Sequence, residues 1–289
     1  EKTMEGNFKI NSNYFNANEW LVEEAETAPK VGFLNTYNQA PKAVLTENEP
    51  TTEIFDRFNF NVDADIKQLD YDVYKMEDFE FDGTINPERT IIDNFYTKID
   101  KSDIQASGNI NNLIGYAMDN EMLTGNIDLK SNYLDLNQFM TETEATETTE
   151  SLEIIPVPDN IDLTISSNLK KVRYTNFDLT NIRGDVVVKE SAAVMKDVKG
   201  KILGGDVSFE GAYNTQDLSQ PKFDIKTTLE ALNFNSAFNT FNTFEQLAPI
   251  GKFIDGKFNT ELSMNGILGS DMMPDLGSLN LSGFFHTLE

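Results

Sequence analysis

The chain has 289 residues, and its 48 Asp and Glu against 23 Lys and Arg give a formal net charge of −25. This excess of negative charge argues against nucleic acid as a partner, because phosphates are neutralised by Lys and Arg. It also provides no electrostatic attraction to anionic lipid headgroups. The length is sufficient for one large domain or two ordinary ones with a sizeable core.

Cysteine is absent and histidine occurs once, as His286. Disulfides, thiolate catalysis, Cys-ligated zinc and iron–sulfur clusters are therefore excluded. A Ser-His-Asp triad or a site with several His ligands is disfavoured. We expect no enzyme activity, no metal and no cofactor.

No apolar run approaches the roughly 20 residues that cross a bilayer, and no signal peptide is present. The chain begins at Glu1 without an initiator Met. We expect it to be a fragment or a processed product of a longer protein.

A phrase near the start recurs more than a hundred residues later. Residues 6–21, "GNFKINSNYFNANEWL", resemble residues 125–140, "GNIDLKSNYLDLNQFM". The shared positions are Gly6/Gly125, Asn7/Asn126, Ser12/Ser131, Asn13/Asn132, Tyr14/Tyr133 and Asn18/Asn137. Such a phrase is either a binding site used twice or the end of a structural unit. A diverged third version from Gly256, "GKFNTELSMNGIL", lacks Asn-Tyr and favours the second interpretation.

Further correspondences follow in the same order along the chain. Residues 58–71 align with 161–174, residues 76–85 align with the segment around Gly184, and residues 102–110 align with 205–213. A copied supersecondary unit explains such a set. After each copy of the phrase comes an acidic stretch that lacks side chains to bury.

The expected organisation consists of five segments. We expect the closing strand and turn of a truncated preceding repeat in 1–24, a polar linker in 25–52, a β-groove repeat in 53–140, an acidic linker in 141–152, and a second repeat in 153–289 that includes a helix over 235–248.

The local pattern is mostly β. In "GDVSFEGAY", Val207, Phe209 and Tyr213 alternate with Ser208 and other residues of the opposite face. Strands at intervals of about 8–12 residues, bounded by Gly, Pro and Asn, predict an antiparallel meander. Two helices interrupt it. The first is "NNLIGYAMDN", with Asn111 or Asn112 as a cap and an apolar stripe of Leu113, Ile114, Ala117 and Met118; the second is "NSAFNTFNTFEQLAP".

Two motifs suggest sites that the spacing excludes. "KGKILGGD", residues 199–206, lacks the Walker spacing, and a hairpin turn is favoured. "DFEFDGTINPER", from Asp78, places Arg89 where a calcium loop needs Glu. Paired carboxylates are too common in so acidic a chain to indicate a glycosidase.

The aromatic content raises a question of fold. The chain has 21 Phe, many on alternating strand faces, and only two helices to cover them. An apolar sheet face either packs on a second sheet, as in a closed β-sandwich, or lines a groove for an apolar ligand. Composition alone favours the sandwich.

Residues 157–215, beginning "VPDNIDLTISSNLKK", resemble the C-terminal region of AsmA-like proteins, as does the following stretch "ALNFNSAFNTFNTFEQLAPIGKFIDGKFNTELSMNG". The similar elements are a Pro-led strand, a "GG-x-[VL]" hairpin, a helix that ends in "LAP", and a glycine-led strand. "LTGNIDLKSNYLDLNQFM" is similar to an element upstream of these in Bacteroidetes-type members.

The resemblance implies an envelope protein of a Gram-negative bacterium, anchored in the inner membrane by an N-terminal helix that this chain lacks, with its body in the periplasm. It implies a bridge-like lipid-transfer protein whose repeated β-groove units form a long, curved, open antiparallel sheet. With the resemblance included, the open groove is favoured over the sandwich.

The expected partner is a phospholipid or another acyl lipid, and the expected role is intermembrane lipid transport or outer-membrane homeostasis. The alternative is a periplasmic or surface β-sandwich module that binds a glycan or a protein through exposed Asn and Tyr. The residues predicted to line the lipid groove are Ile127, Leu129, Val186, Val188, Val207, Phe209 and Tyr213.

Overall fold

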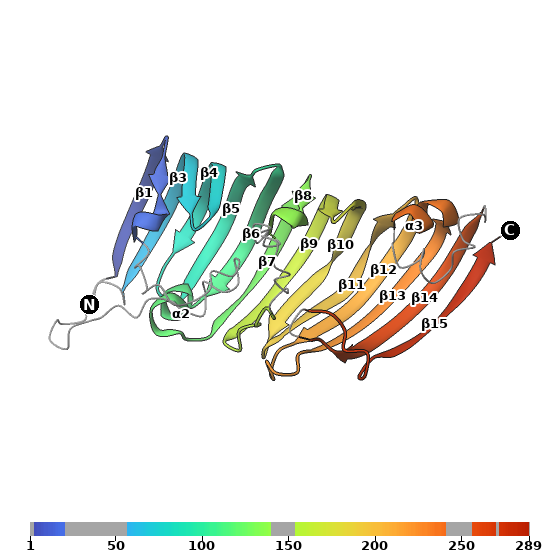
Figure 1. Cartoon of the computed structure of the whole chain (residues 1–289). Coiled ribbons are helices and arrows are strands. Elements are labelled where there is room, and N and C mark those ends of the chain that lie inside the picture. The colour runs from blue at the N-terminus through green and yellow to red at the C-terminus, as the bar shows by residue number, and fades with distance from the viewer. Residues whose placement is uncertain (1–2, 21–56, 140–153, 241–255, 270–271, 289) are drawn as a thin grey trace, which may run out of the picture. The chain divides into compact units, whose positions relative to one another are not determined.

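A computed structural model describes residues 3–20, 57–139, 154–240, 256–269 and 272–288 (Figure 1). The two predicted linkers, 25–52 and 141–152, lie outside these residues, as do residues 241–248 of the predicted second helix. The described residues are mainly β, as predicted, and they divide into two compact units.

The first unit consists of Glu1–Asn132 and Asn160–Ser166. Its elements are β1 (Met4–Ser12), β2 (Phe15–Asn16), η1 (Ala17–Trp20), β3 (Phe58–Tyr71), β4 (Tyr74–Ile85), β5 (Arg89–Ile99), β6 (Ser102–Asn111), α2 (Leu113–Asp119) and β7 (Leu123–Ser131). The strand order is β1-β3-β4-β5-β6-β7, followed by the first residues of β9. Pairing is antiparallel from β3 to β7 and parallel between β1 and β3.

The second unit consists of Tyr133–Asp159 and Ser167–Glu289. Its elements are β8 (Leu134–Asp135), η3 (Leu136–Phe139), the greater part of β9 (Ile161–Tyr174), β10 (Phe177–Lys189), β11 (Ala192–Ile202), β12 (Gly205–Asn214), β13 (Lys222–Asn233), α3 (Phe234–Thr240), β14 (Lys257–Ile267) and β15 (Asn280–Leu288). The strand order follows the sequence from β9 to β15. Figure 1 shows β12 to β15 curved along their length.

The sheet of each unit is open. Among the described strands, β1 pairs only with β3, and β15 pairs only with β14. No second sheet packs on either unit within the part of the chain that the structure describes, so the predicted open antiparallel sheet is confirmed and the alternative of a closed sandwich is wrong for these residues.

The pairing register is regular except at β-bulges. The β12–β13 register continues without a shift from Asp206↔Glu230 to Asn214↔Lys222. Shifts occur in β10–β11 and in β11–β12, close to Asn181 and Asp197, which both have positive φ. A bulge places an extra residue in one strand and increases the local twist. The sheet can therefore curve while the apolar side chains of each strand remain on one face.

The two predicted helices are present, with differences in detail. In α2 the buried residue is Tyr116, whereas Ala117 of the predicted stripe is exposed. Asn112 is the N-cap residue as predicted, but in a left-handed conformation and without a side-chain cap bond, since its amide donates to Glu121 Oε2 and Met122 O. The described part of the second helix is α3, which begins at Phe234 and is capped by Asn233, whose Oδ1 accepts from Ser236 N at 2.9 Å.

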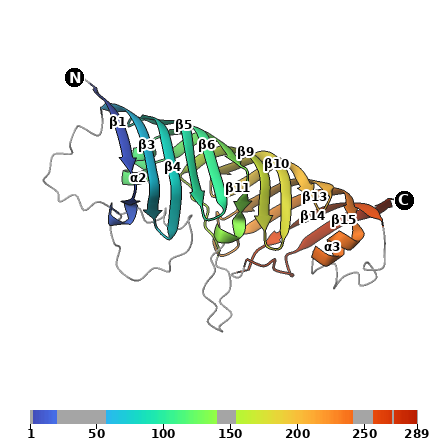
Figure 2. The same cartoon turned by 90° about the horizontal axis from the view of Figure 1, so that it is seen from above.

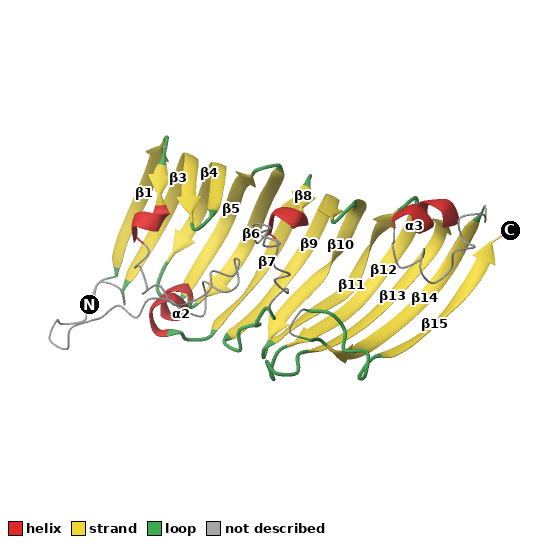
Figure 3. Ribbon diagram, viewed as in Figure 1, coloured by secondary structure: helices red, strands yellow, loops and turns green. Residues whose placement is uncertain are grey.

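Figure 3 shows α3 near one end of β13 and β14, and the view from above in Figure 2 places it to one side of the sheet. The central parts of these strands have no described helix over them. The helix α3 therefore covers only one end of these strands.

The repeated phrase has the same structural role in both places. Each copy contains a strand that is followed by a two-residue strand and a 3₁₀ helix. Asn18 accepts from Asp72 N (2.6 Å) and donates to Asp72 O (3.2 Å). Asn137 does the same with Thr175, at 2.8 Å and 3.2 Å. Both partners are turn residues with positive φ in the next hairpin.

The third version proposed from Gly256 shares only the strand of the phrase. β14 pairs antiparallel with β13 and β15, and among the described residues that follow it there is neither a two-residue strand nor a 3₁₀ helix. The similarity of "GKFNTELSMNG" to the phrase reflects the common alternation of a strand that follows glycine.

We predict that Asn137→Ala destabilises the β9–β10 turn by about 1–2 kcal/mol, because two hydrogen bonds to the backbone of a strained residue are lost. Amide hydrogen exchange at Thr175 measures the local opening free energy. Asn126→Ala, the same substitution at an exposed residue of β7, is the matched control and should leave exchange at Thr175 unchanged. Equal exchange in the wild type and Asn137→Ala would contradict this role.

The β9–β10 hairpin also contains the ion pairs Lys171–Asp178 (2.9 Å) and Arg173–Asp178 (3.1 Å). The hydrogen bond from Lys171, together with Arg173, holds the pKa of the Asp178 carboxyl below its usual 3.8. A depressed carboxyl pKa contributes stability above pH 3.8, and this stability is lost as the pH falls through the folded pKa.

We therefore predict that Asp178→Asn lowers the free energy of unfolding near neutral pH, by at most about 1 kcal/mol since the pair is partly solvated. The difference from the wild type should decrease below pH 3.8. Denaturant unfolding at a series of pH values measures it, and a difference that does not depend on pH would contradict the assignment.

Candidate functional site

The apolar face of the second unit is a set of side chains that the register places on one side of β10 to β15. One row across the sheet runs Val186–Met195–Gly211–Ile225–Met264–Leu281. The neighbouring rows are Val188–Ala193–Tyr213–Phe223–Gly266 and Val198–Phe209–Thr227–Leu262–Gly283. With strands about 4.8 Å apart, a row over six strands extends for about 24 Å.

None of the paired residues in these rows is charged. The opposite face of the same strands is largely polar, with rows such as Arg183–Lys199–Ser208–Thr228–Glu261, although Val187, Val194 and Phe284 also lie on it. The strands are therefore amphipathic, as "GDVSFEGAY" predicted for β12. A sheet of this kind exposes its polar face to water, and its apolar face is stabilised when other apolar groups cover it.

Glycines reduce how far side chains project from the apolar face. A Cβ added at Gly211 would lie 3.0 Å from the Phe209 ring and 3.3 Å from Met195 Cε. A Cβ at Gly283 would lie 2.8 Å from Leu262 Cδ2. The side chains of Phe209 and Leu262 therefore lie over neighbouring glycines, which makes the apolar face flatter.

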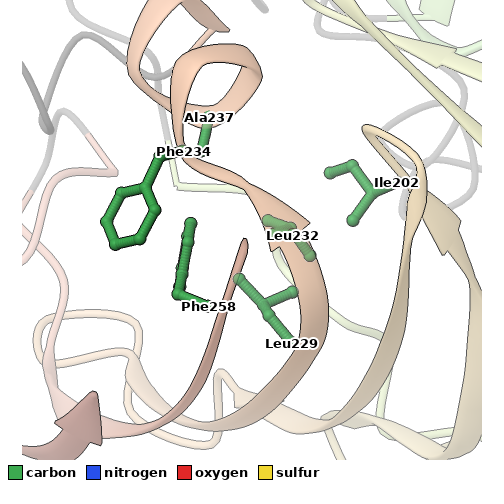
Figure 4. Close-up of a cluster of buried hydrophobic side chains, with 6 residues drawn as sticks. All are labelled: Ile202, Leu229, Leu232, Phe234, Ala237 and Phe258. Carbon is green, nitrogen blue, oxygen red and sulfur yellow. The ribbon is translucent and has the colours of Figure 1, made fainter. Parts of the chain in front are cut away.

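One end of this face is covered by α3 (Figure 4). Phe234 and Ala237 of the helix point toward Phe258 and Leu232 of the strands. The ring centroids of Phe234 and Phe258 are 4.7 Å apart, and those of Phe258 and Phe285 are also 4.7 Å apart. Phe258, Leu232 and Ala237 are fully buried, so this end forms a closed hydrophobic core.

The other end is covered by segments that reach Tyr213. The Tyr213 hydroxyl donates to Ile155 O at 2.8 Å and lies 3.8 Å from Met272 Sδ. Burial raises the pKa of the Tyr213 phenol above its usual value. Val157 N donates to the buried Thr215 Oγ1 at 2.8 Å and fixes the segment in place.

Between the two covered ends the apolar face is accessible. Leu262, Phe285 and Leu281 are exposed to 39%, 49% and 63%. Val186, Met195, Phe209 and Ile225 are half-buried, because neighbours on the same face shield one another. The result is a strip across the strands that no described segment outside the sheet covers, and α3 and the Tyr213 contacts bound it.

The first unit has a corresponding apolar face. Its rows are Phe8–Val62–Gly83–Ile92–Gly108–Ile127 and Ile10–Ala64–Phe81–Phe95–Ala106–Leu129. Phe8 and Phe60 contact edge to face at 4.8 Å. On the opposite face, Asn61 donates to Asn7 and accepts from Thr84, so polar side chains form a ladder there.

All seven residues predicted to line a groove lie on these two faces. Ile127 and Leu129 lie at the ends of the rows of the first unit, and the other five lie within the apolar face of the second unit. Tyr213 differs from the rest because its hydroxyl is engaged by Ile155. It belongs to the covered end and not to the open strip.

Sequence reasoning missed several residues of the same faces. Phe8, Phe60 and Val62 alternate in β1 and β3 as clearly as the predicted set does in β12. This signal was available in the sequence. The role of Phe234 was not, because its partners Phe258 and Phe285 come from later strands.

The motifs excluded by spacing have structural roles. "KGKILGGD" forms the turn between β11 and β12, with Leu203 and Gly204 at positive φ. The segment from Asp78 lies in β4, where Lys98 pairs with Asp78 at 2.9 Å. Among the described residues, no group of three or more His, Asp or Glu is arranged to hold a metal ion.

No protein-family model matches the chain, and no curated protein and no solved structure matches it either. Within the part of the chain that is described, no helix has the length and apolar character needed to span a membrane.

We predict that Phe234→Ala lowers the free energy of unfolding by about 3–4 kcal/mol, since a buried ring is lost beneath α3. Phe284→Ala, on the polar face and 58% exposed, is the matched control and should cost about 0.5 kcal/mol or less. Denaturant unfolding followed by circular dichroism measures both values. Equal losses in the two variants would show that α3 does not depend on Phe234.

Proposed function

We propose that the protein holds acyl chains of lipids on the apolar faces of its open sheet. The observation that carries this proposal is the uncharged, partly exposed strip between α3 and the Tyr213 contacts. Exposed apolar surface of this extent is uncommon in soluble proteins and typically marks a binding site.

The physical basis is the hydrophobic effect. Each CH₂ group of an acyl chain that leaves water contributes about 0.8 kcal/mol. The strip has no charged side chain at its paired positions, and side chains project little from it over Gly211 and Gly283. It therefore offers contact to an apolar chain without a fixed pocket. A chain can therefore occupy several equivalent positions along a row of strands.

The proposal includes a setting. The resemblance to AsmA-like proteins supports a place in the periplasm of a Gram-negative bacterium, with attachment to the inner membrane through a segment outside this chain. In that setting the sheet would shield phospholipid chains during transport between membranes. The net charge of −25 is consistent with binding through the apolar chain and not through an anionic headgroup.

The alternative of a glycan-binding module receives less support. It relied on exposed Asn and Tyr side chains in the repeated phrase. Asn18 and Asn137 are engaged with the backbone of the next hairpin, and the Tyr14 hydroxyl donates to Asp70 at 3.0 Å. These residues therefore serve the structure.

We predict that Val186→Glu weakens binding of a fluorescent fatty acid by about tenfold or more, because a carboxylate then lies in the apolar strip. Val187→Glu is the matched control: it makes the same substitution one residue along β10, on the opposite face, where Val187 pairs with Val194. Val187→Glu should leave binding unchanged within about twofold.

Fluorescence titration of the purified chain measures both affinities, and circular dichroism shows that both variants are folded. Native mass spectrometry of protein extracted with membrane lipid should also show bound phospholipid. No binding by the wild type, or equal losses in the two variants, would contradict the proposal.

A further inference from the structure

Three hydroxyl groups lie on the apolar face of the second unit at the paired positions of β11 to β14. They belong to Tyr213 of β12, Thr227 of β13 and Thr260 of β14. A polar group in an apolar surface needs a hydrogen-bond partner once water is excluded from it. The partner of each hydroxyl therefore shows whether the chain itself satisfies that need.

Two of these hydroxyls are used within the chain. The Tyr213 hydroxyl donates to Ile155 O at 2.8 Å. Thr260 Oγ1 donates to Phe284 O, also at 2.8 Å, and Thr260 is only 4% exposed. Both hydroxyls lie where the chain covers its own apolar face, and both are satisfied there.

Thr227 is different. No hydrogen bond joins its Oγ1 to any residue that the structure describes. The buried side-chain oxygen without a partner in the described parts of the chain is Thr90 Oγ1, so the unpaired oxygen of Thr227 is accessible from outside. The hydroxyl of Thr227 is therefore available to water or to a ligand.

The position of Thr227 along β13 is in the accessible strip. Phe223, near the Tyr213 contacts, is 7% exposed, and Leu229, in the core beneath α3, is 9% exposed. Ile225 and Thr227 lie between them and are half-buried. Thr227 is thus the first residue on this face of β13 beyond the core that α3 covers.

Its neighbours across the sheet are apolar. Thr227 pairs with Phe209 of β12 and with Leu262 of β14, and Leu262 is 39% exposed. The row continues to Val198 and Gly283 without a charged side chain. A ligand that lies along this row contacts apolar groups on both sides of one unpaired hydroxyl.

An acyl chain over this row would displace water from the Thr227 hydroxyl. Loss of that water without a replacement is unfavourable, and an acceptor on the ligand removes the penalty. An ionised carboxylate is a poor acceptor here, because the row has no cation to offset its desolvation. An ester carbonyl is neutral and accepts a hydrogen bond.

We propose that Thr227 donates a hydrogen bond to the ester carbonyl of a bound acyl lipid. This inference rests on the proposed function and narrows its ligand to a neutral acyl ester, in preference to a plain hydrocarbon chain or to an ionised carboxylate placed on the strip. The apolar side chains hold the acyl chain, and Thr227 favours the position in which the carbonyl lies beside β13.

The experiment compares two lipids that differ in one carbonyl group. They are palmitoyl lysophosphatidylcholine and its hexadecyl ether analogue, each used below its micelle concentration to displace a fluorescent fatty acid from the purified chain. The wild type should bind the ester about fivefold more tightly than the ether, as one net hydrogen bond provides.

Thr227→Val replaces the hydroxyl by a methyl group of similar size and should abolish the preference for the ester, with the ether bound at least as tightly as by the wild type. Thr227→Ser keeps the hydroxyl and should keep the preference. Thr228→Val is the matched control: it makes the same substitution at the next residue, on the opposite face, where Thr228 pairs with Ser208 and Glu261. It should leave the preference unchanged.

The outcomes separate this inference from the proposed function. Equal affinities of the wild type for ester and ether, or a preference that persists in Thr227→Val, would overturn the inference alone. A wild type that binds neither lipid nor the fluorescent fatty acid would overturn the proposed function and this inference with it. Circular dichroism shows that the three variants are folded.

Discussion

The structure depends on strand register. Side chains alternate between the two faces of a strand, so a slip of one residue between two strands would move an entire set of apolar side chains to the other face. In β12 and β13 the register runs without interruption, and Val207 and Phe209 share a face with Leu229 and Thr227. Where β10 and β11 contain bulges, near Asn181 and Asp197, the register shifts by one residue, and the apolar residues on both sides of each bulge still share one face. The strands can therefore twist and curve while the apolar and polar faces remain separate.

An open sheet with one apolar face leaves hydrophobic surface in contact with water, which is unfavourable by about 25 cal/mol per Å². The chain reduces this cost locally. The helix α3 buries Phe258 and Leu232 at one end, and Tyr213 is covered at the other. Between these ends the side chains shield one another and lie over glycines such as Gly211. A bound acyl chain would cover the apolar side chains that remain exposed to water. This is the physical argument for the proposed role in holding acyl chains.

The repeated phrase marks the same hydrogen-bonded connection to the next hairpin at two places in the structure. Asn18 and Asn137 each make two hydrogen bonds to one residue of the next hairpin, at Asp72 and Thr175 respectively. Both partner residues have positive φ, a conformation that costs energy outside glycine and is stabilised here by the amide of the asparagine. Repetition of the phrase therefore reflects a repeated requirement of the backbone. The glycine and tyrosine of the phrase belong to the same strands and turns.

The sequence determined by itself that the chain is mainly β, that its strands have one apolar face, and that helices lie near residues 113 and 234, because alternation and capping depend on residues close together in the chain. It also placed Val186, Val188, Val207 and Phe209 on strand faces, since period-two alternation is local. Only the tertiary structure decided that the sheet is open, that Asn137 bonds to Thr175 and not to a ligand, and that Tyr213 belongs to a covered end. These features depend on which strands become neighbours, and pairs such as Tyr213 and Ile155 are 58 residues apart. Spacing within one strand contains no information about such contacts.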